Sequence, residues 1–148
     1  MKKCITDYLE ESKNKFKDKI VFIEKNRQIT YNDFVIESKK VATSILKYNL
    51  YNKPIVIFID KTINALSSMI GVTYSANFYT VIDTNMPKNR IENIFDRLKP
   101  MLIITDNKNY EKLKRYNFNI ETLIFEDTQE KEIDENKVKE AYDNRINA

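Results

Sequence analysis

From residue 54 to residue 125, short apolar runs alternate with longer stretches whose apolar residues recur at helical spacing. The first run, Ile55 to Ile59, is rich in β-branched residues and apolar on both faces, which is typical of a parallel strand covered by helices on each side. Further strands are predicted at residues 79–82, 101–104 and 122–125. The alternation predicts an α/β fold, a parallel sheet with helices on both faces and right-handed crossovers.

Before the sheet, the sequence predicts a small helix and a β-hairpin. The hairpin is expected to join residues 20–23 to 28–31 through a polar turn. A long helix is then expected from about Tyr31 to Tyr48, because Thr30 offers a hydroxyl at its start and Asp33 lies three residues on. The other helices expected from periodicity cover residues 7–17, 62–76, 87–98 and 110–116.

The chain has 148 residues, the size of one domain that buries a core of its own. We expect residues 1–125 to form the folded unit. After Glu126 the sequence turns acidic and poor in apolar residues. Residues 126–148 are therefore expected to form an acidic linker or a loose terminal helix.

Composition excludes several kinds of site. With no histidine and one cysteine, Cys4, the chain lacks the ligands of a zinc or haem site and the usual catalytic triads. A single cysteine also excludes an internal disulfide and favours a reducing compartment. The net charge is +3 with both signs interspersed, which argues against nucleic-acid binding. Because no apolar run approaches the roughly 20 residues of a membrane span, we expect a cytoplasmic protein without membrane contact.

The single glycine, Gly71, bears on nucleotide binding. Parallel α/β folds commonly hold phosphates with glycine-rich turns, because backbone amides can close around a phosphate only where Cβ atoms are absent. The sequence contains no such turn. Gly71 itself falls within a predicted helix, where we expect close packing against the sheet.

Three aspartates, Asp60, Asp83 and Asp106, each follow a predicted strand. Open α/β sheets bind ligands at this edge, so three carboxylates there suit a magnesium ion. The alternative is that each aspartate caps the next helix or closes a turn, which is the commoner use of this residue after a strand. A receiver-like phosphorylation site is not expected, since no strand ends in an adjacent acidic pair.

Aromatic and basic residues interleave near residue 115, a pattern that suits either single-stranded nucleic acid or a short amphipathic helix with solvated lysines. Lys88 and Arg90, at the start of a predicted helix, oppose the helix dipole and suggest ion pairs with carboxylates rather than an anion site. The interleaved residues are Tyr110, Lys112, Lys114, Arg115, Tyr116 and Phe118.

Two segments resemble core motifs of the adenylate-forming ligase superfamily. The segment Ile29 to Phe34 resembles the first motif, a hydrophobic residue, Thr or Ser, and Tyr at the start of a long helix. The segment Ser75 to Asp83, followed by Pro87 and Arg90, is similar to the second motif, Lys-Ala-Gly-x-Tyr-Val-Pro-Ile-Asp, then Pro, then Arg. The resemblance covers about residues 7–125 and implies a structural role for Thr30, Tyr31, Ala76, Tyr79, Asp83, Pro87 and Arg90.

Two positions depart from the second motif. Asn77 stands where the motif has glycine, an exchange that we expect to be tolerated because asparagine also adopts left-handed backbone conformations. Val81 replaces the usual proline. Both departures suggest a divergent member of the superfamily.

The resemblance implies a ligase that activates a carboxylate. Among such ligases the chain most resembles the amino-acid-activating domains of peptide synthetases and the D-alanine carrier-protein ligases. ATP and Mg are the implied cofactors, and the thiol of a carrier protein or coenzyme A is the implied acceptor. The family's phosphate loop, magnesium motif, ribose-binding Asp and C-terminal Lys have no counterparts here. We therefore expect an N-terminal fragment that binds no cofactor and is inactive without the rest of the ligase.

The alternative is a non-catalytic α/β interaction module that uses the same scaffold. If the rest of the ligase is absent, the sheet edge and the helix faces that would dock against it are left exposed, and exposed apolar patches favour self-association.

Overall fold

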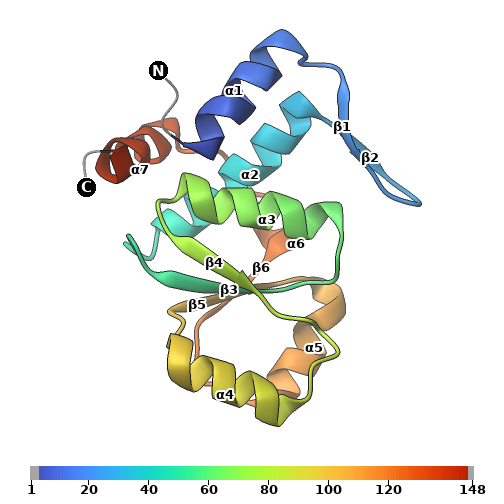
Figure 1. The fold of residues 1–148 in the computed structure, drawn as a ribbon, viewed down its shortest axis with the longest axis vertical. Helices are drawn as coiled ribbons and strands as arrows, with labels where there is room; N and C mark the ends of the chain where they lie inside the picture. The colour runs from blue at the N-terminus through green and yellow to red at the C-terminus, as the bar shows by residue number, and fades with distance from the viewer. Residues whose placement is uncertain (1–3, 147–148) are drawn as a thin grey trace.

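The computed structural model describes residues 4–146, and its centre is a four-stranded, wholly parallel sheet (Figure 1). The strand order is β4-β3-β5-β6, so the first strand, β3, lies inside the sheet and β4 forms one edge. Neighbouring strands pair in regular register, with Ile55 beside both Tyr79 and Leu102. The predicted α/β class is confirmed. The strands are β3 Pro54–Phe58, β4 Phe78–Val81, β5 Leu102–Thr105 and β6 Thr122–Ile124.

Helices cover both faces of the sheet (Figure 1). Helices α2 (Tyr31–Leu46) and α3 (Ile63–Tyr74) lie on one face, and α4 (Lys88–Leu98) and α5 (Asn107–Tyr116) lie on the other. Strand residues alternate between two cores: Ile55, Ile57, Leu102 and Ile104 pack with α2 and α3, whereas Val56, Phe58 and Ile103 pack with α4 and α5. This alternation explains why the strands read as continuously apolar.

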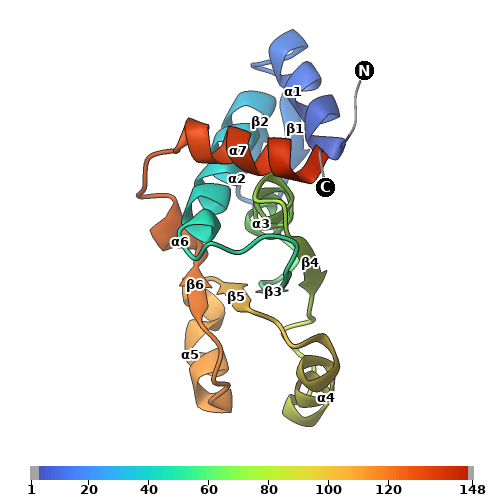
Figure 2. The same ribbon diagram turned by 90° about the vertical axis from the view of Figure 1, so that its left-hand side faces the viewer.

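The predicted N-terminal helix and hairpin form a further layer beyond α2 and α3 (Figures 1 and 2). They comprise α1 (Ile5–Lys15), β1 (Ile20–Ile23) and β2 (Gln28–Thr30), and the two strands pair antiparallel. A short helix, α6 (Phe125–Thr128), follows β6, and α7 (Glu135–Ile146) then lies across α2 with Val138 and Ala141 buried. Within residues 4–146, no helix combines the length and apolarity that crossing a bilayer requires.

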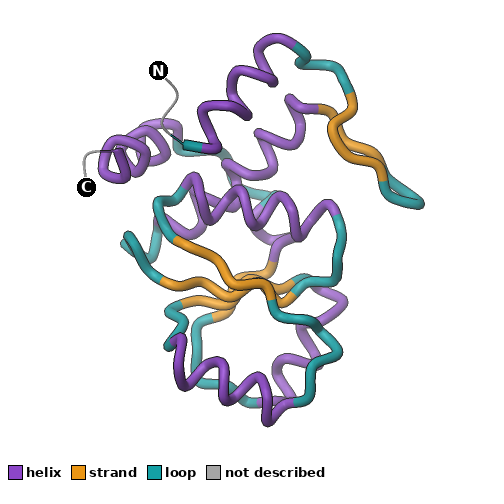
Figure 3. Tube along the Cα trace, in the orientation of Figure 1, coloured by secondary structure: helices purple, strands orange, loops and turns teal. Residues whose placement is uncertain are grey.

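Helix starts follow their capping residues, and Figure 3 shows where each helix meets its loop. The Thr30 hydroxyl accepts a hydrogen bond from the Asp33 N–H at 3.2 Å, as expected for the start of α2. By contrast, α5 begins at Asn107, three residues before the predicted start, because the Asp106 carboxylate accepts the Asn109 N–H at 3.0 Å.

Gly71 was expected to pack closely against the sheet. The close packing is present, but the partner is helix α2 and not the sheet. A Cβ on Gly71 would lie 2.6 Å from the Val41 Cβ and 2.8 Å from the Ser38 carbonyl oxygen, and both of these residues belong to α2. Gly71 therefore lets two helices approach, not a helix and a sheet. The sequence pattern could not separate these two partners because both are apolar.

Replacing Gly71 by alanine is expected to lower the free energy of unfolding by about 1–3 kcal/mol, because the added methyl overlaps Val41 and a backbone oxygen. This loss should appear although alanine is the better helix former. Chemical denaturation of Gly71→Ala beside Asn93→Ala, an exposed position on α4, measures the difference. An unfolding midpoint equal to or above that of the natural chain would contradict the close approach.

Candidate functional site

The connections of the sheet reverse between β3 and β5. From β3 the chain passes through α3 on one face to β4, whereas β4 connects to β5 through α4 on the opposite face. Open α/β sheets bind their ligands in the crevice that such a reversal leaves at the carboxyl ends of the strands. The residues that follow β3 and β5 therefore form the candidate site.

Side chains of this chain bridge that edge. The Lys108 ammonium donates to the Asp60 carboxylate at 2.6 Å, and the Thr84 hydroxyl donates to the other carboxylate oxygen of Asp60. The Lys112 ammonium donates to the Thr84 carbonyl. Residues after β3, β4 and β5 are thus connected by one network of Asp60, Thr84, Lys108 and Lys112.

Hydrogen bonds are the main cause of the pKa shifts of Asp60 and Lys108 in this network. The hydrogen bond from Lys108, followed by that from Thr84, lowers the pKa of Asp60 below its ordinary value. The same bond to Asp60 raises the pKa of Lys108. Asp60 is therefore a stable carboxylate at neutral pH, and it offsets the charge of the nearest lysine.

The other two strand-end aspartates serve the backbone. The Asp83 carboxylate accepts the Asn85 N–H at 2.8 Å and closes the turn after β4. Asp106 caps α5 and also accepts the Asn109 side-chain amide at 2.9 Å. Among residues 4–146, no three His, Cys, Asp or Glu side chains gather as metal ligands, so Asp60, Asp83 and Asp106 do not form a magnesium site.

The aromatic and basic residues near residue 115 lie on and just after an amphipathic helix. The Phe118 ring packs against Phe95 of α4 with centroids 4.7 Å apart, and Tyr116 meets Phe118 edge-on at 5.9 Å. The Lys114 ammonium lies 3.0 Å from Glu111. This packing uses two of the rings that stacking on nucleic acid bases would need.

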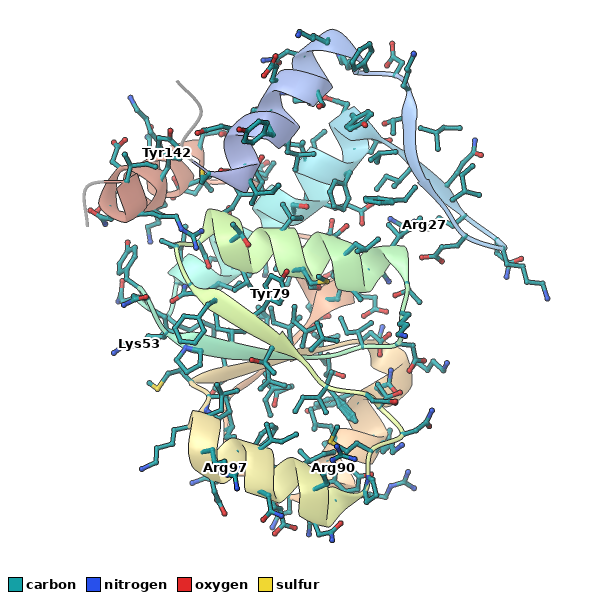
Figure 4. The ribbon with its side chains drawn as sticks, in the orientation of Figure 1. Arg27, Lys53, Tyr79, Arg90, Arg97 and Tyr142 are labelled. Carbon is teal, nitrogen blue, oxygen red and sulfur yellow. The ribbon has the colours of Figure 1, made fainter. Side chains whose placement is uncertain are left out.

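The charged residues at the start of α4 have separate environments. Lys88 lies 3.8 Å from the Glu92 carboxylate, one turn along the helix, as the ion-pair interpretation predicts. Arg90 is exposed in the first turn of α4 (Figure 4). Pro87 is the N-cap residue of α4 rather than its first helical residue.

The first motif forms the junction between β2 and α2. Thr30 is the N-cap residue described above, and the Tyr31 N–H donates to the Lys19 carbonyl at 2.9 Å. Both side chains are half-buried. The motif therefore fixes the angle at which the chain leaves the hairpin.

The structure corrects the expectation that Asn77 takes the left-handed conformation in the second motif. The left-handed residue is Ala76, with φ of 64°, and Asn77 is not left-handed. Ala76 closes α3 in a Schellman turn: its N–H donates to the Thr73 carbonyl at 3.1 Å, and the Asn77 N–H donates to the Val72 carbonyl at 3.2 Å. Alanine thus occupies the position that helix ends usually give to glycine.

Asn77 has a role that the sequence did not reveal, because its side chain connects segments that are distant in the chain. Its carbonyl oxygen accepts the Lys53 N–H at 2.9 Å, and its amide donates to the Leu50 carbonyl at 2.9 Å. The side chain is buried, so these bonds satisfy groups that water does not reach. Asn77 therefore holds the loop before β3 against the start of β4.

The motif residues do not converge on one site. Tyr79 lies half-exposed on the edge strand β4, Asp83 lies in the turn after it, and Pro87 and Arg90 lie at the start of α4. Lys108 and Thr84, which sequence reasoning missed, meet at the candidate edge with Lys112, which the sequence had indicated only as part of the aromatic and basic pattern. No local pattern distinguishes them, because their contacts cross between separate strand-helix units.

Replacing Asn77 by alanine is expected to lower the free energy of unfolding by about 1–3 kcal/mol, because the Lys53 N–H and the Leu50 carbonyl each lose a buried partner. Asn93→Ala, exposed on α4, is the matched control and should change it by less than about 0.5 kcal/mol. Urea denaturation measures both. Equal midpoints for the two variants would remove the proposed role of the Asn77 side chain.

Asp60→Asn tests the electrostatics of the network. Because the folded pKa of Asp60 is lowered, its contribution to stability is present above the unfolded pKa and is lost as pH falls through the folded pKa. The stability difference between the natural chain and Asp60→Asn should therefore be largest near neutral pH and shrink below about pH 4. Thermal unfolding across pH measures it, with Asp96→Asn on α4 as control. A pH-independent difference would contradict the pairing.

Known proteins are similar to this chain in sequence. The sequence model of the AMP-binding enzyme family matches residues 9–146. Among curated relatives, gramicidin S synthase 1 of Brevibacillus brevis is 24% identical over 126 residues, which cover 84% of this chain and 12% of the relative. The D-alanine–D-alanyl carrier protein ligase of Lactococcus lactis is 27% identical over 88 residues, which cover 60% of this chain and 18% of the ligase.

Solved structures share the fold. The N-terminal subdomain of Klebsiella oxytoca NpsA, in complex with 3-hydroxybenzoyl-AMSN, superposes with a TM-score of 0.75 at 16% identity, over 90% of this chain and 33% of that chain. The O-succinylbenzoate coenzyme A synthetase of Bacillus subtilis, in complex with AMP, gives 0.74 at 12% identity, over 86% and 33%. The chain thus spans about a third of these structures and less than a fifth of the two relatives above. The chain belongs to the AMP-binding enzyme family.

Proposed function

We propose that this chain is the N-terminal part of an adenylate-forming ligase. Such an enzyme activates a carboxylate with ATP and Mg, forms an acyl-adenylate with release of pyrophosphate, and transfers the acyl group to a thiol. The observation that carries the proposal is the family match over residues 9–146, which includes both motifs. The parallel sheet with its N-terminal helix and hairpin supports the same assignment.

The proposed substrate class is amino acids. The relatives that support it are gramicidin S synthase 1 and D-alanine–D-alanyl carrier protein ligase, the second of which names an amino acid and its carrier. The proposed acceptor is therefore the thiol of a carrier protein, with coenzyme A as the second acceptor to test, since one structural neighbour is a coenzyme A synthetase.

The residues of this chain do not fit Mg-ATP. The only glycine lies inside α3 against α2, so no strand of the chain is followed by a glycine-rich phosphate loop. At the edge where a ligand is expected, Asp60 already pairs with Lys108, and Lys112 is bonded to the Thr84 carbonyl. We therefore propose that the chain alone is inactive and that other segments of the ligase supply the groups that bind ATP.

In this proposal the chain contributes a scaffold. The Asp60–Lys108 pair and the Thr84 bonds tie together the loops after β3, β4 and β5. The second motif anchors β4 through Ala76 and Asn77. These features stabilise one edge of the sheet without presenting free phosphate ligands.

Pyrophosphate exchange tests the proposal with two proteins. The 148-residue chain should show no carboxylate-dependent exchange of pyrophosphate into ATP, and isothermal titration should detect no micromolar binding of Mg-ATP. A protein encoded by the reading frame extended beyond residue 148 should show exchange that depends on one amino acid in a panel of amino acids and aryl acids.

The experiments on the two proteins test different parts of the proposal. Exchange or micromolar Mg-ATP binding by the 148-residue chain would overturn its inactivity. An extended protein that folds but exchanges with none of the acids, or a reading frame without a phosphate-loop segment, would overturn the ligase assignment and leave the non-catalytic interaction module.

A further inference from the structure

Strand β4 forms an edge of the sheet that carries no charge and no proline. It pairs with β3 on one side, and on its other side no strand lies within the described residues (Figure 2). The strand sequence, Phe78 to Val81, contains no charge and no proline, and its register with β3 is regular. Charge and proline are two of the protections that natural edge strands carry, and the protection that β4 has is its short length of four residues. Phe78, Tyr79 and Val81 are 45%, 39% and 45% exposed, so the edge also offers apolar side chains.

The backbone groups that face outward can be identified from the hydrogen bonds to β3. The Phe78 N–H donates to the Lys53 carbonyl and the Ile82 N–H to the Ile57 carbonyl, at 3.1 and 3.0 Å. Because successive residues of a strand alternate in direction, Tyr79 and Val81 direct their N–H and C=O groups away from β3. The edge therefore offers two donors and two acceptors.

We infer that this edge binds a second copy of the chain, with the two β4 strands antiparallel about a twofold axis at Thr80. In that register Tyr79 lies opposite Val81 of the second copy, and each such pair exchanges two hydrogen bonds, four in total. Pairs of an aromatic and a β-branched residue are favourable across strands. The edge is thus complementary to itself, as a twofold interface requires.

The charges that flank β4 also fit this occupant. In the same register Asp83 of the second copy lies opposite Asn77, and the Asn77 side chain accepts the Lys53 N–H at 2.9 Å, one residue before the paired part of β3. Both Asp83 and Lys53 are exposed, and Lys53 directly precedes β3 (Figure 4). The twofold arrangement therefore brings a carboxylate toward an ammonium twice, and it places no like charges opposite each other.

An apolar groove beside β4 supplies further contact. It has a volume of about 380 Å³ and lies between the hairpin, α3 and the ends of β3 and β4. Residues directly opposite in paired strands share a face. Because Val81 lines this groove, the Tyr79 ring of the second copy lies at its mouth. The apolar residues that line this groove include Phe22, Ile23, Ile59, Leu66, Met69 and Val81.

A disulfide tests the register. In a Cys4→Ser background, Thr80→Cys places a cysteine opposite its own copy in a non-hydrogen-bonded pair, where Cα atoms lie about 4.5 Å apart and can be bridged. Mild oxidation should give a covalent dimer on non-reducing gels. Tyr79→Cys is the matched control, because its two copies are offset by two residues along the strands, about 7 Å, and should not be bridged.

Sedimentation equilibrium tests the interface without cross-linking. The chain should show a concentration-dependent dimer between micromolar and millimolar protein, and Val81→Lys should weaken it by at least about tenfold. Ile20→Lys on β1, a strand residue of similar exposure at 43%, should leave the dimer unchanged. Melting curves show whether each variant folds.

Three results would overturn the inference. The first is a monomer at every concentration, which is also the result expected if the edge is reserved for a strand from the rest of a ligase. The second is equal cross-linking of the Thr80→Cys and Tyr79→Cys chains. The third is equal weakening by Val81→Lys and Ile20→Lys, which would place the contact elsewhere.

Discussion

The close approach of α2 and α3 at Gly71 is the constraint on which the rest of the structure depends. Helix α2 contacts the hairpin and α1 on one side, whereas short loops connect α3 to the strands β3 and β4 of the sheet. Val41, which faces Gly71, also belongs to the core that contains Ile55 and Leu102 on the strands of the sheet. A side chain at position 71 would separate these helices, and with them the N-terminal layer from the sheet.

Features carried by local periodicity could be predicted from the sequence. The strand β3 and the helix α2, which follows Thr30, needed only a β-branched apolar run, helical spacing and a cap. Features that depend on contacts between distant segments could not be predicted. The partner of Gly71, the bonds of Asn77 to the loop before β3 and the Asp60–Lys108 pair all join residues at least 24 positions apart. The exchange of roles between Ala76 and Asn77 was missed because a backbone turn is set by φ, which residue type only biases.

We propose that the scaffold of the ligase and its chemistry lie in different parts of the sequence. Both motifs lie where they shape the chain: Thr30 at a helix start and Ala76 at a helix end. The candidate edge, by contrast, is held by an ion pair and by bonds to Thr84. The proposed division of labour follows, with this chain supplying a rigid sheet and other segments supplying the ligands of ATP.

We propose that the edge after β3 and β5 supports the fold and does not bind nucleotide. The most direct measurement follows the backbone amides of Thr84, Asp106 and Lys108 by ¹H–¹⁵N NMR while Mg-ATP is added to the 148-residue chain. We predict that these amide shifts stay unchanged up to millimolar Mg-ATP. Saturable shifts confined to these three residues would contradict the account, because they would show a nucleotide site at the edge that Asp60 and Lys108 close.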